Sequence, residues 1–142
     1  MKLPPLTTPE QNIHEAVATL LYRVVLPPAE WSFFPAGAVP LPPRLAAKLY
    51  RMGLRRGWPD FIIVHDRIYG LELKREGGTL SKTRTVRSKR GGVRLLEGQA
   101  DVFPRLERAG MVLAVCRTVD EVLEQLVRWQ IPVRWHVPLE VV

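Results

Sequence analysis

Apolar residues recur along the chain with two different periods, and the changes of period separate helices from strands. From residue 9 onward, Ile13, Val17, Leu20 and Val24 stand three or four positions apart, which predicts an amphipathic helix that ends before Pro27. The same spacing predicts further helices over 45–52, 99–108 and 119–127.

Short runs of apolar and mostly β-branched residues predict the strands, which we place within 31–34 and over 61–64, 68–73 and 111–116. The middle two runs are close enough to form a hairpin, and they are apolar on both faces, which is typical of a central position in a sheet. Helices and strands that alternate in this way predict one α/β domain with a central mixed sheet flanked by helices. We expect one domain over 1–142, with a core at about 10–131, a basic loop at 77–96 and an irregular tail at 132–142.

Charged residues stand at one end of the predicted hairpin. Glu72 and Lys74 are two positions apart on a strand, so their side chains leave the same face. Whether Asp60 joins them depends on the turn between the strands. A two-residue turn puts Asp60 opposite Leu73, on the other face, whereas a three-residue turn that includes His65 puts it opposite Glu72. The sequence leaves both registers open.

The second register would bring two carboxylates and an ammonium group together. Carboxylates that close raise the pKa of one of them unless a cation lies between them. Hard oxygen ligands with open positions suit Mg²⁺ or Mn²⁺, which can lower the pKa of a bound water and neutralise charge on a phosphodiester. This register therefore predicts metal-dependent phosphodiester hydrolysis, with Lys74 orienting the water or stabilising the charge. The alternative is a surface ion pair of Glu72 and Lys74 beside an Asp60 that caps a turn.

The charge of the chain is unevenly distributed. Its 21 Lys and Arg residues outnumber its 14 Asp and Glu residues, and the segments 31–59 and 77–96 contain basic residues and no acidic ones. Such segregation indicates a polyanionic partner, most commonly nucleic acid, although two solvated loops would give the same pattern. The candidate DNA-binding residues are Arg55, Arg56, Lys82, Arg84, Arg87, Lys89, Arg90 and Arg94.

The composition excludes several classes of protein. A single cysteine, Cys116, allows no intrachain disulfide framework and no thiolate zinc site, and its apolar neighbours favour a core position. The chain has no apolar run of membrane-spanning length and no signal-peptide pattern. We therefore expect a cytoplasmic protein with no membrane partner. We further expect it to be of a bacterial or phage-encoded type and to need no small-molecule cofactor.

The motif around the hairpin is similar to that of a known family. It comprises Gly57-x-Pro59-Asp60, eleven intervening residues, Glu72-x-Lys74, the Gly77-Gly78 turn with Leu80-Ser81, and a later Gln99. It resembles the VRR-NUC branch of the PD-(D/E)xK nuclease superfamily. The resemblance implies a restriction-endonuclease-like fold and a homodimeric DNA endonuclease. The substrates that it implies include branched DNA such as Holliday junctions.

The resemblance also implies roles for individual residues. Asp60, Glu72 and the backbone carbonyl of Leu73 would bind the metal, Lys74 would be the catalytic lysine, and Gln99 would approach the site from a helix. Family members often carry an acidic residue on the first helix, for which Glu10, His14 and Glu15 are the candidates here. Successive residues of a helix are about 100° apart, so Glu15 points away from the apolar stripe, whereas Glu10 and His14 flank it. For all three, the alternative is a position on a solvated helix face. A non-catalytic nucleic-acid-binding accessory protein remains the alternative function.

Overall fold

The computed structural model describes residues 9–35 and 41–134 of the 142-residue chain. Its elements are, in chain order, α1 (Pro9–Val24), β1 (Glu30–Phe33), α2 (Pro43–Arg51), β2 (Phe61–Val64), β3 (Ile68–Leu73), β4 (Arg84–Arg87), β5 (Val93–Leu96), α3 (Gln99–Arg108), β6 (Met111–Cys116) and α4 (Val119–Arg128). The four predicted helices and four predicted strands are all present, with ends that differ from the predictions by a few residues at most.

The main sheet has four strands in the order β1-β2-β3-β6. Neighbouring strands from β1 to β3 run antiparallel, and β6 runs parallel to β3, so the sheet is mixed, as predicted. The hairpin of β2 and β3 occupies the centre, also as predicted. The apolar run of β6 indicates a buried strand, but β6 lies at the edge of the sheet, and Met111 to Val115 are only partly buried.

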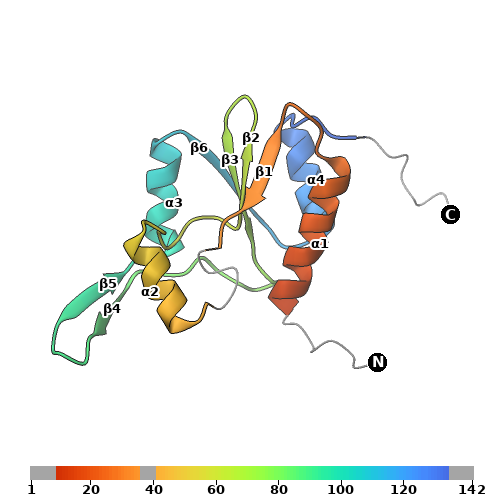
Figure 1. The fold of residues 1–142 in the computed structure, drawn as a ribbon. Coiled ribbons are helices and arrows are strands. Elements are labelled where there is room, and N and C mark those ends of the chain that lie inside the picture. Colours follow the sequence, from red (N-terminus) through yellow and green to blue (C-terminus); the bar gives the residue numbers. More distant parts are fainter. Residues whose placement is uncertain (1–8, 36–40, 135–142) are drawn as a thin grey trace, which may run out of the picture.

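Helices cover both faces of this sheet (Figure 1). On one face, α1 and α4 pack against each other and enclose the core through residues such as Leu21 and Leu126, which contact the central strands around Phe61 and Leu71. On the other face, α3 packs against β6. Cys116 is buried, as predicted, and burial raises the pKa of its thiol to about 11, so it is an unreactive core residue.

The segment 77–96 differs from its prediction. We expected a loop without regular structure, but β4 and β5 form an antiparallel two-stranded sheet in which Arg84 lies opposite Leu96 and Arg87 opposite Val93. Figure 1 shows this hairpin extending away from the main sheet, beside α2. The prediction was wrong because a ribbon held together by backbone hydrogen bonds needs no buried face. Its two strands have only four residues each, so they carry too little apolar alternation to be recognised within a basic segment.

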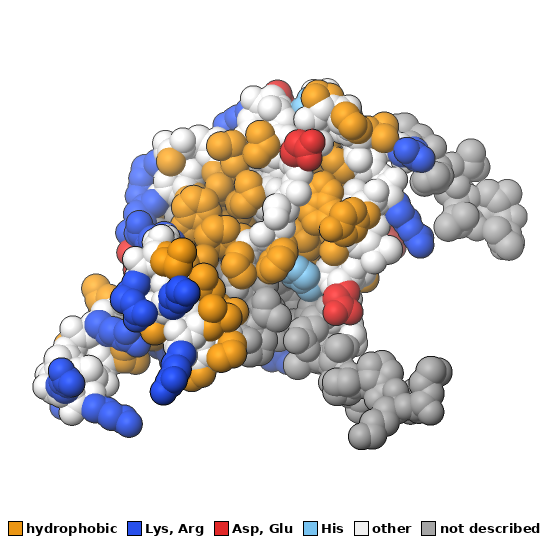
Figure 2. Space-filling model, viewed as in Figure 1, with side chains coloured by type: hydrophobic (Ala, Val, Ile, Leu, Met, Phe, Trp, Pro, Cys, Tyr) orange, Lys and Arg blue, Asp and Glu red, His pale blue; other side chains and the backbone are white. Residues whose placement is uncertain are grey.

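Basic side chains gather over the part of the surface that α2 and the β4–β5 hairpin form (Figure 2). None of the helices within residues 9–35 and 41–134 is long and apolar enough to cross a membrane.

Candidate active site

The register of the central hairpin decides whether the two carboxylates meet. Val64 lies opposite Ile68 and Phe61 opposite Leu71, so the turn has three residues, and the next pair beyond the ladder is Asp60 and Glu72. This is the register that a catalytic site requires. The backbone N–H of Asp60 donates a hydrogen bond to Glu72 Oε2 over 3.2 Å, which fixes the two residues side by side.

The turn before β2 places Asp60 at this position. Gly57 has a φ of +80°, a conformation that L side chains rarely adopt. A Cβ atom there would also lie 2.7 Å from a methyl group of Val102 on α3, so the close packing of this turn against α3 requires glycine. Pro59 follows as a fully buried residue, and Asp60 comes directly before β2.

Glu72 is buried, with only 3% of its surface exposed. Gln99 Nε2 donates a hydrogen bond to Glu72 Oε1 over 2.7 Å, and Lys74 Nζ lies 3.4 Å from the same oxygen. Burial, together with the negative charge of Asp60, raises the pKa of Glu72 to about 8, although Gln99 and Lys74 oppose the shift. Glu72 is therefore largely protonated at neutral pH unless a further cation approaches.

Opposing effects also act on the pKa of Asp60. Burial raises the pKa of its carboxyl group, while the N–H of Leu73 and the charges of His14 and Lys74 act in the opposite direction. The Leu73 N–H donates to Asp60 Oδ2 over 2.8 Å. Two carboxylates that are partly withdrawn from water and lie next to each other would both be stabilised in their ionised forms by a divalent cation.

The backbone of Leu73 faces the same side as these carboxylates. The next N–H, that of Lys74, donates to the carbonyl of Cys116 on β6, so successive backbone groups of β3 alternate between its two neighbours. Since the N–H and C=O of one residue leave an extended strand on the same side, the Leu73 carbonyl is directed toward Asp60. That this carbonyl is a third oxygen ligand stays a prediction of the resemblance.

Gln99 lies at the start of α3, and Ser81 orients it. The Ser81 hydroxyl accepts a hydrogen bond from the Gln99 N–H over 3.0 Å, and the Ser81 N–H donates to Gln99 Oε1 over 3.4 Å. This pair holds the amide with its oxygen toward Ser81 and its Nε2 toward Glu72. Because helix N-termini leave N–H groups without intrahelical partners, Ser81 also serves as the cap that Gly98 cannot provide.

The three candidates on the first helix have different environments. The His14 ring stacks on Phe61, with 4.5 Å between ring centroids, and meets Phe33 edge-on. It is partly buried near Asp60, so the structure brings this candidate toward the site. Glu15 is exposed, in agreement with its predicted direction. Glu10 belongs to α1, but its side chain lies outside the described part of the structure.

Asp60, Glu72, Lys74 and Gln99 surround one cavity of about 260 Å³. Its remaining lining residues are Tyr50, Arg56, Gly57, Ser81 and Glu97. The sequence pattern predicts no individual role for Tyr50, Ser81 or Glu97. Tyr50 and Glu97 carry no signal in the sequence, because their place depends on how α2 and β5 meet.

The candidate oxygen ligands suit a hard cation that takes only a few of its ligands from the protein. Within the described residues, no group of three or more His, Cys, Asp and Glu side chains is arranged to hold a metal, so the candidate ligands are two carboxylates and one carbonyl. Mg²⁺ is commonly bound by one or two carboxylates together with waters and substrate phosphates, whereas a structural zinc site would need four protein ligands.

The other candidate DNA-binding residues lie outside the cavity. They are exposed, with Arg55 beside Arg56 after α2, and Lys82, Arg84, Arg87, Lys89, Arg90 and Arg94 on or next to the β4–β5 hairpin. The chain matches no family model, and no curated protein or solved structure shows a significant match. The site is therefore interpreted from its own geometry.

Proposed function

We propose that this protein is a metal-dependent nuclease that hydrolyses phosphodiester bonds in DNA, with a fold and site of the PD-(D/E)xK type that its motif resembles. The observation that carries the proposal is the pairing of Asp60 and Glu72 at the end of a central hairpin, with Lys74 Nζ 3.4 Å from Glu72. A buried acidic pair is costly to a fold, and it becomes favourable when it holds a cation.

Asp60, Glu72 and the Leu73 carbonyl would hold the cation. Bound there, Mg²⁺ or Mn²⁺ would supply a water of lowered pKa and neutralise charge on the phosphate. The Lys74 side chain is 20% exposed and lines the cavity, so its ammonium group can donate hydrogen bonds to the attacking water or to a phosphate oxygen. Gln99 keeps Glu72 in one orientation, which is a positioning role.

DNA is the substrate that the surroundings of the cavity favour. Arg56 lines the cavity itself, and basic side chains gather over α2 and the β4–β5 hairpin (Figure 2). Lys and Arg side chains at such a surface neutralise backbone phosphates, which gives affinity without base specificity.

Cleavage of plasmid and branched DNA with Mg²⁺ and with EDTA tests the proposal. Asp60→Asn and Glu72→Gln each remove one ligand charge with little change of volume, so both should abolish cleavage while DNA binding and the fold persist. Glu76→Gln is the matched control, because Glu76 is exposed and outside the cavity. Wild-type cleavage by Glu72→Gln, or cleavage that persists in EDTA, would contradict the proposal.

One observation favours a second candidate, an accessory protein that binds DNA without cutting it. Among the described residues, no buried side-chain nitrogen or oxygen lacks a hydrogen-bond partner, so the network around Glu72 is complete without a metal. A protein of this kind would bind DNA equally well with Mg²⁺ and with EDTA and would leave every substrate intact. The same cleavage panel therefore separates the two candidates.

We also propose that the nuclease acts as a homodimer. The described part of one chain provides one Asp60–Glu72 cavity, whereas double-stranded and branched DNA present two strands. Light scattering of the free protein and of its complex with duplex DNA measures the stoichiometry, and one chain per DNA molecule under cleaving conditions would contradict this part of the proposal.

A further inference from the structure

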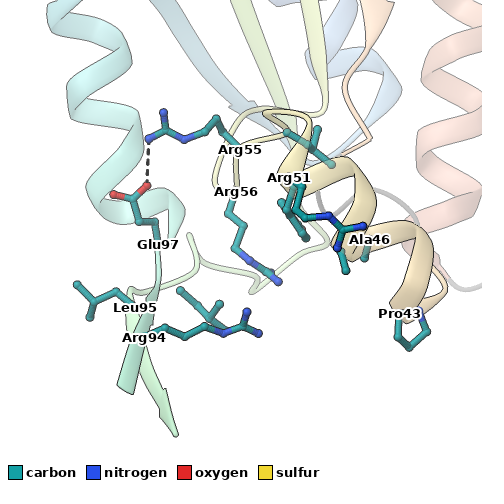
Figure 3. A pocket seen from close by; sticks show the side chains of 12 residues that line it. Pro43, Ala46, Arg51, Arg55, Arg56, Arg94, Leu95 and Glu97 are labelled. Atoms are coloured by element: carbon teal, nitrogen blue, oxygen red, sulfur yellow. Dashed lines mark ion pairs between the residues drawn. The ribbon is translucent and has the colours of Figure 1, made fainter. Parts of the chain in front are cut away.

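A second, larger pocket adjoins the candidate active site. It has a volume of about 710 Å³ and lies between α2, the loop after it and β5 (Figure 3). Tyr50, Arg56 and Glu97 line both this pocket and the active-site cavity, so the two are neighbours with a common wall. Its volume lies within the range of about 300 to 1,000 Å³ that is typical of small-molecule sites.

Apolar side chains form much of this pocket. Ala46, Ala47 and Tyr50 come from α2, Leu54 from the following loop and Leu96 from β5. A pocket that only bound the outside of a double helix would not need such a lining, because a duplex presents phosphates and sugars outward and keeps the faces of its bases stacked. An unpaired base, by contrast, has an exposed π-face that is stabilised by apolar and aromatic neighbours.

Guanidinium groups surround the apolar part. Figure 3 shows Arg56 and Arg94 reaching toward the middle of the pocket from the loop and from β5, with Arg51 on the α2 side. Arg56 lies over the Tyr50 ring, 4.6 Å from its centroid, so a flat guanidinium surface and an aromatic surface stand together. Arginine at such a place can both stack on a base and bind a phosphate.

The one acidic residue in the lining is neutralised. Glu97 pairs with Arg105 over 2.8 Å and with Arg55 over 3.6 Å, and these arginines hold the pKa of its carboxyl group below its usual value. The remaining charge of the pocket, from Arg51, Arg56 and Arg94, is positive. An apolar surface bordered by positive charge is complementary to a nucleotide, which has an apolar base and an anionic phosphate.

We infer that this pocket binds an unpaired nucleotide next to the phosphate that the active site holds. The inference rests on the proposed function and extends it: the preferred substrate is DNA with a single-stranded end or an extruded nucleotide near the cleaved bond, in place of uninterrupted duplex.

Binding measured in EDTA tests the inference without any cleavage. Fluorescence anisotropy compares a duplex that has a short single-stranded overhang with a blunt duplex of the same number of phosphates. The wild-type protein should bind the overhang DNA about tenfold more tightly, since one stacked base contributes roughly this much. A 2-aminopurine base moved along the overhang should be quenched at one position, where the base enters the pocket.

Ala46→Phe fills the pocket without changing its charge, because Ala46 lies in the lining and is partly exposed. This variant should lose the preference for the overhang and bind the blunt duplex as the wild type does. Ala16→Phe is the matched control, because Ala16 is an exposed alanine on α1, outside the pocket. It should keep the preference.

Equal affinity of the wild type for both DNAs, or an unchanged preference in Ala46→Phe, would overturn the inference. If the protein cleaves DNA with Mg²⁺ but shows no preference, the pocket inference fails and the nuclease proposal stands. If neither DNA is bound, the inference and the choice of DNA as substrate fail together.

Discussion

Glu72 offers a test that depends on protonation and not on cleavage. The pKa of Glu72 rises from 4.5 to about 8 in the folded protein, first because the side chain is buried and second because Asp60 is negative. Between these two pH values the unfolded chain has released the proton, while the folded chain still holds it. The folded state therefore loses stability as the pH rises through this window, and below pH 4.5 both states are protonated.

The size of the loss follows from the width of the window. At about 1.4 kcal/mol for each pH unit, the rise from 4.5 to about 8 corresponds to about 5 kcal/mol of the free energy of unfolding. This is a large part of the roughly 5 to 15 kcal/mol that stabilises an ordinary domain. Glu72→Gln removes the titrating group with little change of side-chain volume.

Urea unfolding between pH 4.5 and 8.5 in EDTA measures the effect. The change in the free energy of unfolding with pH is compared between the two proteins, so any pH-independent cost of the glutamine cancels. Across the window, the stability of Glu72→Gln should rise relative to that of the wild type by about 5 kcal/mol, or about 2 M in urea midpoint. Addition of Mg²⁺ at high pH should stabilise the wild type, by about 2.7 kcal/mol at a hundredfold excess over the dissociation constant. It should leave Glu72→Gln unchanged.

Glu76→Gln is the control variant, because the Glu76 side chain is exposed. The stability of this variant should change with pH as that of the wild type does. Parallel pH profiles of the wild type and Glu72→Gln would refute a raised pKa of Glu72. That result would mean that Glu72 is already ionised in the folded protein at neutral pH and that Lys74 and Gln99 satisfy it without a metal.

Three further perturbations address other parts of the molecule. Lys74→Ala should reduce the cleavage rate by about a hundredfold or more and leave Mg²⁺ affinity, measured by calorimetry, largely unchanged, since Lys74 donates to substrate or water and does not bind the metal; a wild-type rate would make the lysine structural. Replacement of Arg84, Arg87, Lys89 and Arg90 by alanine should weaken binding to all DNA sequences alike and flatten its salt dependence, by about four in the slope if all four contact phosphates, whereas an unchanged slope would transfer the DNA surface to the Arg44–Arg56 stretch. Gly98→Ala should lower the free energy of unfolding by about 2 to 4 kcal/mol in urea, because a Cβ atom there would lie 2.3 Å from the Lys82 backbone carbon. Gly77→Ala is the control, since no atom lies within 4 Å of a Cβ atom added at Gly77. It should cost less stability than Gly98→Ala.

The sequence predicted the parts of the fold that a hydrophobic period marks. Val17 and Val24 on α1 are buried where the pattern placed them, and so are most residues in the apolar runs of β2 and β3. Val64 and Ile68, next to the turn, are exposed. The hairpin register could not be chosen from the sequence, because a shift by one residue exchanges two faces that are both apolar. The structure shows the three-residue turn, with the His65 N–H donating to the Arg67 carbonyl.

The parts that were missed have their signal in contacts between distant segments. The β4–β5 ribbon is held by its own ladder and exposes Val93 and Leu95, so its composition resembles that of a loop. Ser81 and Gln99 are eighteen residues apart, and their reciprocal hydrogen bonds exist only because the segment before β4 passes the start of α3. No local pattern in the sequence marks such a pair.

The burial of Glu72 contradicts one of the two interpretations that the sequence left open for the hairpin end, the surface ion pair. A solvated ion pair of Glu72 and Lys74 requires exposed side chains, yet Glu72 is 3% exposed and its oxygens accept from Gln99 and from the Asp60 N–H. A surface pair contributes at most about 1 kcal/mol, whereas burial of an acidic pair destabilises a fold, and apolar residues of similar volume would often be more stable there. The surface interpretation is therefore wrong. This cost, at the mouth of a cavity lined by Lys74 and Arg56, supports the proposal that the cavity binds a cation and a phosphate.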